Sequence, residues 1–201
     1  MDFLLHSPTA HVCLGAGLAG LCGFRAFLPI ALLGLFSRLG YLAAPSLANT
    51  PFSFLEQTWV IIVFFVLAVV EMGLDKISEQ RLAVDFVFNP LRVLAGALAF
   101  ASTLAEYGTV PLVVGAVAGA IIALVAHVAQ GALRSAVDGA GTERSAPFLS
   151  FFEDIAVIVG AFALLLLPWL GIPVLFFVFF LVYRVRVRRK RKYRGLRILR
   201  D

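Results

Sequence analysis

The sequence predicts an all-α integral membrane protein with about six transmembrane helices. Of its 201 residues, 61% are hydrophobic and 14% are charged, and the mean hydropathy is +0.98. A helix needs about 20 mostly apolar residues to cross roughly 30 Å of hydrocarbon. The stretches that meet this requirement are 13–36, 58–75, 86–102, 110–133 and 150–184. We therefore expect one transmembrane domain, residues 1–189, followed by a basic cytoplasmic tail, residues 190–201.

The first apolar stretch is expected to remain in the protein as one spanning helix. The first dozen residues contain no Lys or Arg, and the stretch that follows is longer than the apolar core of a signal peptide. Pro29 predicts a kink in this helix. Cys13 and Cys22 lie nine residues apart and fall on opposite faces of a helix, so we interpret both as packing residues.

The last apolar stretch is long enough for two helices. It contains the segment "PWLGIP", with Pro168, Gly171 and Pro173. Two prolines that flank a glycine remove backbone donors from successive turns and favour a reversal of the chain. We therefore predict one helix over 151–167 and a returning helix over 172–188, which gives six spans.

Positive charge predicts the orientation. Ten of the seventeen Lys and Arg residues lie between Arg184 and Arg200, and positive charge in short loops marks the cytoplasmic side. The C-terminus is therefore expected inside. With six spans the N-terminus is inside too, and the loops 76–86 and 134–149 are cytoplasmic.

The basic tail also predicts a partner. Lys and Arg near a membrane surface attract anionic lipid headgroups, by about 1 kcal/mol per residue. Because the tail directly follows a span, we expect it to bind lipid headgroups and not nucleic acid. The residues expected to contact headgroups are Arg186, Arg188, Arg189, Lys190, Arg191 and Lys192.

Small residues recur every fourth position in the first and fourth apolar stretches, a spacing that lets helix backbones approach closely. The rows are Gly15, Ala19 and Gly23, and one hundred residues later Gly115, Gly119 and Ala123. If 1–104 and 105–189 are repeats of three spans each, the second is inverted, as in many transporters. The alternative is that the rows are unrelated packing seams. The rows also permit a homodimer without requiring one.

Charged residues inside the spans are the candidate site. A charge deep in a bilayer costs about 2.5 to 3.5 kcal/mol and usually faces a bundle interior, a partner charge or water. The candidates for binding a substrate or ion are Arg25, Glu71, Asp75, Arg92, His127, Arg134, Glu153 and Asp154. The alternative is structural pairing, in which Glu71 and Arg92 only fix the register of two helices.

Several segments carry a resemblance to a known family. They are "GFRAFLPIALLGLFSR", "VEMGLDK", "NPLRVLAGAL", "AHVAQGALRSAVD" and "SFFEDIAVIVG". On these segments the chain resembles the bacterial membrane family called domain of unknown function 4126. The resemblance implies a small multi-pass protein of the bacterial inner membrane and no particular activity. It also implies that the eight candidate residues and Lys76 belong to the family pattern.

The charges favour three classes of function. The first hypothesis is a secondary transporter or lipid translocator with a charged cavity in its cytoplasmic half, where acids couple to a proton or cation and arginines hold an anionic group. The second is a membrane enzyme that holds Mg²⁺ or Mn²⁺ beside a lipid headgroup. The sequence contains no recognised catalytic or metal-binding spacing and identifies no cofactor, so it favours transport over catalysis. The third is a structural or assembly subunit.

Overall fold

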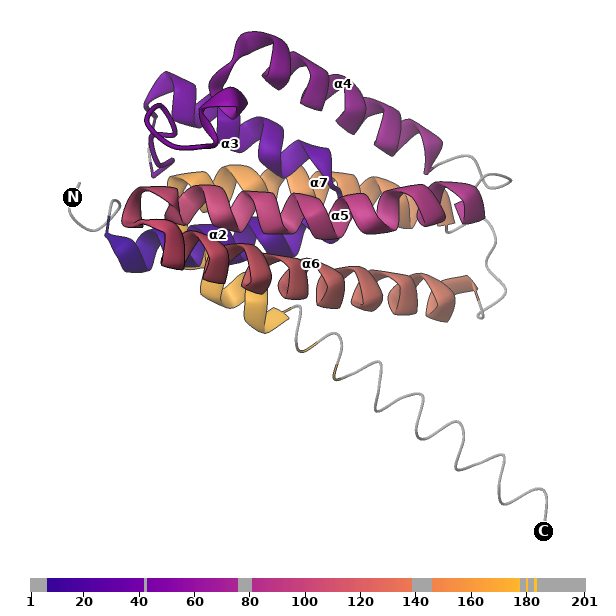
Figure 1. Cartoon of the computed structure of the whole chain (residues 1–201). Helices are drawn as coiled ribbons and strands as arrows, with labels where there is room; N and C mark the ends of the chain where they lie inside the picture. The colour runs from indigo at the N-terminus through magenta and orange to yellow at the C-terminus, as the bar shows by residue number, and fades with distance from the viewer. Residues whose placement is uncertain are drawn as a thin grey trace.

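The computed structural model describes residues 7–41, 43–75, 81–138, 146–177, 180 and 183. Over these residues the chain forms α-helices and short 3-10 turns and no strand, so the all-α prediction is confirmed. The helices are α2 (Pro8–Cys22), α3 (Phe27–Leu39), α4 (Thr58–Leu74), α5 (Arg81–Leu104), α6 (Thr109–Asp138) and α7 (Ala146–Leu166), and the 3-10 turns are η1 (Ser53–Glu56), η3 (Ala105–Tyr107) and η5 (Pro168–Leu170) (Figure 1).

Two of the described helical segments, Phe88–Tyr107 and Thr109–Ala132, are long and apolar enough to cross a membrane. The shorter apolar helices are Pro8–Cys22, Phe27–Leu39, Thr58–Leu74 and Pro168–Phe177. Six spans are therefore not confirmed. The two long segments are successive in the chain and pack on one another along their lengths, and α2 lies against both of them.

The first apolar stretch is a helical hairpin, which corrects the prediction of one kinked helix over 13–36. The chain leaves helical geometry after Cys22, and α3 begins at Phe27. His11, near the start of α2, and Arg38, near the end of α3, line the same pocket, so the chain reverses between the two helices. Pro29 lies in the first turn of α3, where its missing N–H costs nothing, and therefore begins a helix instead of kinking one.

The hairpin also changes the predicted position of the N-terminus. The Nδ1 atom of His11 lies 2.8 Å from Oε1 of Glu106 in η3, so α2 begins beside the connection between α5 and α6. Asp75 and Arg134, which border the loops 76–86 and 134–149, meet at the opposite end of α6. The start of α2 is thus not on the side of those loops, and the prediction that it lies with them is wrong.

Glycines bring α2, α5 and α6 into close contact. A Cβ on Gly96 of α5 would lie 2.8 Å from the carbonyl oxygen of Gly119, and a Cβ on Gly23 would lie 2.5 Å from the carbonyl oxygen of Ala123. Both predicted rows of small residues therefore lie at helix contacts in which backbones meet without intervening side chains. The inverted repeat stays a prediction.

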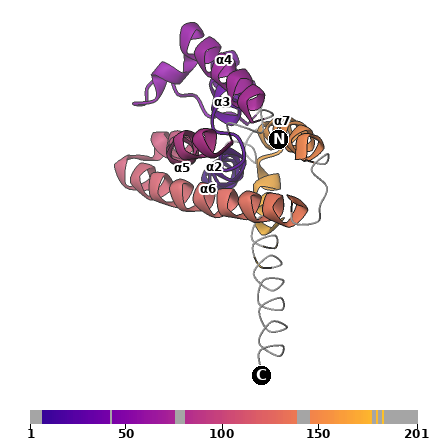
Figure 2. The same ribbon diagram turned by 90° about the vertical axis from the view of Figure 1, so that its right-hand side faces the viewer.

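The segment "PWLGIP" ends α7, as the sequence predicts. Helix α7 finishes at Leu166, η5 follows, and Gly171 packs against the backbone of Cys13 in α2. Figure 2 shows α7 beside α2, with α4 stacked outside α3 and α6 below α5. The tail 190–201 lies outside the described residues, as do the predicted headgroup contacts Arg186, Arg188, Arg189, Lys190, Arg191 and Lys192.

The close contact between α5 and α6 predicts opposite effects of two Gly→Ala substitutions. Gly96→Ala should lower the free energy of unfolding by about 1 to 3 kcal/mol, because its methyl group overpacks the contact with α6. Gly73→Ala in α4 is the matched control. It has no neighbouring atom within 4 Å and should gain up to about 1 kcal/mol from helix propensity. Titration with SDS in mixed micelles measures both, and equal effects would contradict the packing.

Candidate functional site: a buried charge network

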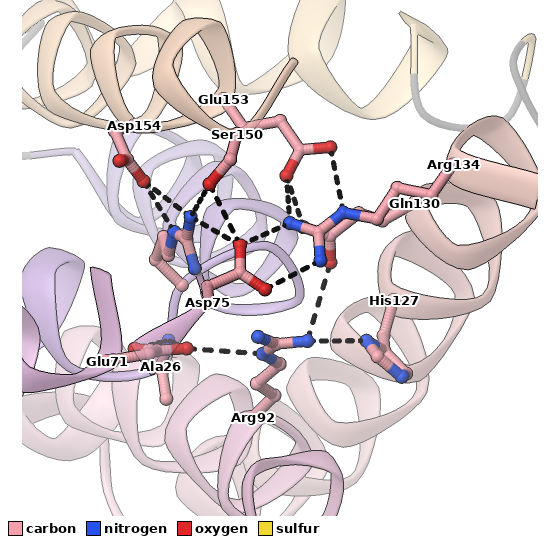
Figure 3. Close-up of polar contacts among 11 residues, drawn as sticks. Ala26, Glu71, Asp75, Arg92, His127, Gln130, Arg134, Ser150, Glu153 and Asp154 are labelled. Atoms are coloured by element: carbon pink, nitrogen blue, oxygen red, sulfur yellow. Dashed lines mark hydrogen bonds and ion pairs between the residues drawn. The ribbon is translucent and has the colours of Figure 1, made fainter. Parts of the chain in front are cut away.

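The structure brings all eight predicted site residues together. They come from the turn between α2 and α3 and from the ends or middles of α4, α5, α6 and α7 (Figure 3). We call them, together with Gln130 and Ser150, the charge network. Hydrogen bonds and ion pairs join its members into one set: Arg25, Glu71, Asp75, Arg92, His127, Gln130, Arg134, Ser150, Glu153 and Asp154.

Arg25 stands at the tip of the hairpin and is completely buried. Its Nε donates to Oδ1 of Asp154 at 2.7 Å, and its Nη2 donates to Oδ2 of Asp75 at 2.9 Å and to Oγ of Ser150 at 3.1 Å. Its Nη1 has no hydrogen-bond partner among the described residues. One guanidinium group therefore ties the hairpin tip to both α4 and α7.

Glu71 stabilises the interruption between α2 and α3. Its carboxylate accepts the backbone N–H of Ala26, at 2.9 Å from Oε2 and 3.2 Å from Oε1, and it also accepts Nε of Arg92 at 3.2 Å. The first N–H groups of a helix have no partner inside the helix and carry partial positive charge. Glu71 supplies that partner from α4, so the start of α3 is satisfied away from water.

Arg134 forms the second junction. It donates to Asp75 through two bonds, Nη1 to Oδ1 at 2.8 Å and Nη2 to Oδ2 at 2.7 Å, and the same Nη2 contacts Oε2 of Glu153. Glu153 also accepts Nε2 of Gln130 at 2.7 Å. The side chain of Arg134 is 18% exposed, against 2% for Asp75 and 7% for Glu153. Arg134 is thus the guanidinium group with the most access from outside the bundle.

Arg92 links α5 to α6. Its Nη1 lies 3.1 Å from Nδ1 of His127 and 3.5 Å from Oε1 of Gln130. A guanidinium group can only donate, so in this bond Nδ1 of His127 is the acceptor. His127 and Gln130 on α6 thus share the guanidinium group of Arg92 on α5.

The chemistry of the network is recognition between guanidinium and carboxylate groups. Arginine offers a planar fork that matches carboxylate and phosphate oxygens, and buried forks of this kind are strong when fully paired. Each carboxylate of the network is held by an arginine, and within the described ranges no three His, Cys, Asp or Glu side chains gather as ligands for a metal ion. The arrangement thus pairs four carboxylates with three guanidinium groups.

Two uncharged side chains and one backbone group belong to the site although the pattern of charged residues does not indicate them. Gln130 precedes Arg134 by four residues, and Ser150 precedes Asp154 by four, so helical spacing places each on the same face as a predicted residue. The N–H of Ala26 depends on the helix break, which the sequence pattern does not show. Asn89 does not join the network: its Oδ1 has no partner among the described residues.

The fold and the site define an all-α protein that contains helices of membrane-spanning length and is built around a buried network of ion pairs. The chain belongs to the family Domain of unknown function (DUF4126), whose sequence profile matches residues 12–188. The match covers every member of the charge network and confirms the resemblance. No curated protein and no solved structure matches the chain.

Neutralising Glu71 should destabilise the fold. Glu71→Gln leaves Arg92 buried without its carboxylate, a change that typically costs 3 to 5 kcal/mol, and we expect about 3 kcal/mol because an amide oxygen can still accept the Ala26 N–H. The double variant Glu71→Gln/Arg92→Met should lose less than the two single variants together. Titration with SDS measures the three free energies of unfolding. Additive losses would show that the two side chains act independently.

Proposed function

We propose that the protein is a small multi-pass transporter of the bacterial inner membrane, and that it moves a solute or lipid that carries a phosphate-like anionic group. The observation that carries the proposal is the gathering of three guanidinium groups, those of Arg25, Arg92 and Arg134, in the interior of an apolar bundle. Such groups are expensive inside a membrane and usually serve a substrate or ion pathway.

The carboxylates of the charge network would hold these arginines while the site is empty. Arg134 joins Asp75 on α4 to Glu153 on α7, and a phosphate group presents the same bidentate geometry as either carboxylate. An entering anion would therefore replace a carboxylate on Arg134 and remove one link between α4 and α7, while the links through Arg25 and Ser150 remain. The released carboxylate would take up a proton or cation, which couples the movement of the anion to that of the ion.

The broken first stretch supports the same proposal. Transporter sites are commonly built where helices are interrupted near the middle of the membrane, so that helix ends face charged groups. Here the interruption lies at 23–26, the start of α3 faces Glu71, and Arg25 extends from the break into the charge network.

The orientation of the transporter follows from its basic residues. In the sequence, Lys76 and Arg144 belong to the segments that join α4 to α5 and α6 to α7, and Arg81 begins α5, whereas Arg38 is near the end of α3. Positive charge marks the cytoplasmic side. The end that contains Arg134 would face the cytoplasm, and α2 would begin on the opposite side.

A structural role is the second candidate, and the complete pairing of the carboxylates favours it. Every carboxylate of the network already accepts hydrogen bonds from an arginine, and such pairs are able to fix helix register without any ligand. In this case the charge network would contribute to folding alone. The two candidates differ in whether an Arg134 variant that folds normally loses transport.

Replacing Arg134 should therefore lower transport. In proteoliposomes we expect Arg134→Gln to slow transport at least about tenfold, the effect of losing one charged hydrogen bond to the moving group, and Arg134→Lys to fall between this variant and the original protein. One arm follows NBD-labelled phosphatidylglycerol by dithionite quenching, and the other follows uptake of radioactive phosphate. Arg38→Gln, which changes an exposed arginine at the other end, is the matched control.

The two arms separate the sources of the anionic group. Transport of the labelled lipid alone identifies a lipid translocator, and uptake of phosphate alone identifies a solute transporter. Equal rates in Arg134→Gln, Arg38→Gln and the unmodified protein would contradict the proposal and favour the structural role, provided that circular dichroism shows the same helix content in all three.

A further inference from the structure

A lateral groove runs between α3, α4, α5 and α6 and has a volume of about 430 Å³. Its lining is apolar throughout: Phe27, Ile30, Phe52, Phe64, Leu91, Leu94, Ala95, Ala97, Leu98, Ala101, Leu112 and Ala116. Leu94 on its rim is 64% exposed, and Val113 beside Leu112 is 52% exposed. The groove therefore opens sideways onto the apolar surface of the bundle, where a membrane would present hydrocarbon.

The length of the groove matches one leaflet of a bilayer. Along α5 it extends from Leu91 to Ala101, ten residues or roughly 15 Å, which is half of the hydrocarbon thickness of about 30 Å. Phe52 and Leu112 lie toward the end that contains the connection between α5 and α6. The groove thus begins near one membrane surface and ends near the middle of the bundle.

Aromatic rings close the inner end. The ring of Phe27 lies 6.0 Å from that of Phe64 and 6.1 Å, edge to face, from that of buried Phe88. Phe27 directly follows Ala26, and Leu91 directly precedes Arg92, so this end adjoins the charge network. The groove therefore adjoins the candidate site and is separated from it by the aromatic rings.

The packing of α4 leaves this space open. Helix α4 packs mainly on α3 and η1, and its polar link to α5 is the pair between Glu71 and Arg92 at its C-terminal end. Figure 1 shows α4 converging on α5 toward that end and diverging from it toward Thr58. No described part of the chain fills the apolar space between the diverging ends of the two helices.

We propose that the lateral groove binds one acyl chain of a phospholipid from the leaflet at the end that contains the α5–α6 connection. The inference rests on the proposed transport function and names a lipid as its substrate class. The terminal methyl group of the acyl chain lies against Phe27 and Phe64, and the lipid headgroup remains at the surface near Phe52. The groove-lining residues Phe27 and Leu91 are next in sequence to Ala26 and Arg92, which Glu71 binds. A lipid in the groove would therefore lie close to this part of the charge network.

The test compares a variant that fills the groove with one that does not. The full-length protein is placed in nanodiscs of palmitoyl-oleoyl phosphatidylglycerol, released into detergent and examined by native mass spectrometry. We expect one retained phospholipid per protein, and we expect Ala97→Trp to lower the retained fraction about tenfold because the indole occupies the groove. Ala156→Trp makes the same change on the exposed surface of α7 and should retain the lipid.

A second groove variant controls for misfolding of the Ala97→Trp protein. Leu94→Trp changes an exposed residue on the rim, which the fold tolerates more readily, and should also lower retention. The proposal is overturned if the original protein retains no phospholipid, if the Trp variants at 94 and 156 retain it equally, or if the groove variants instead convert a dimer to a monomer, which would identify a second copy as the occupant.

The same preparation distinguishes this inference from the proposed function. Arg134→Gln leaves the lining of the groove unchanged and should retain the lipid while losing transport. If lipid retention follows the groove variants but no form of the protein moves NBD-labelled lipid or takes up phosphate, the groove is a lipid site and the proposed function fails. If transport occurs while retention does not respond to the groove variants, the inference about the groove fails by itself.

Discussion

The structure depends on the carboxylate of Asp75, which accepts hydrogen bonds from Arg25 and from Arg134. Arg25 belongs to the hairpin tip and Arg134 to α6, and both arginines also bind acids on α7. One side chain on α4 therefore connects three other parts of the chain. Because a helix such as α4 packs mainly on α3, this junction decides where its C-terminal end lies relative to the rest of the bundle.

Close helix packing lets the tip of the hairpin reach Asp75. The tip of the hairpin lies deep in the bundle because Gly23 meets the backbone of α6 and Gly15 meets side chains of α5 without a Cβ of its own. Small residues replace the hydrophobic force that is absent between helices in lipid. The glycine contacts thus set the depth of the hairpin, and Glu71 and Asp75 satisfy the polar groups that this depth would otherwise bury unpaired.

The sequence identified the members of the charge network better than it predicted the course of the helices. All eight charged residues were identifiable because charge in an apolar stretch is costly, and Gln130 and Ser150 were within reach of the same argument through helical spacing. The hairpin was not, because an apolar stretch interrupted at 23–26 has the composition of a continuous span, and Pro29 fits either a kink or a first turn. The lateral groove was not predictable either, because Leu94 and Ala97 face it with side chains no different from those that face lipid.

A polar route through a bilayer must be closed when no substrate occupies it, and ion pairs close it without leaving unpaired charges. In the proposed transporter, the bonds of the charge network that fix helix register would also hold the site shut, so stability and gating would use one set of residues. Arg134 is the most exposed of the three arginines in the charge network and bridges two helices, so an anion from outside the bundle would meet its bonds first. The lateral groove approaches the same site from the apolar side, so the two features together suit a molecule that has both a charged group and a hydrocarbon chain.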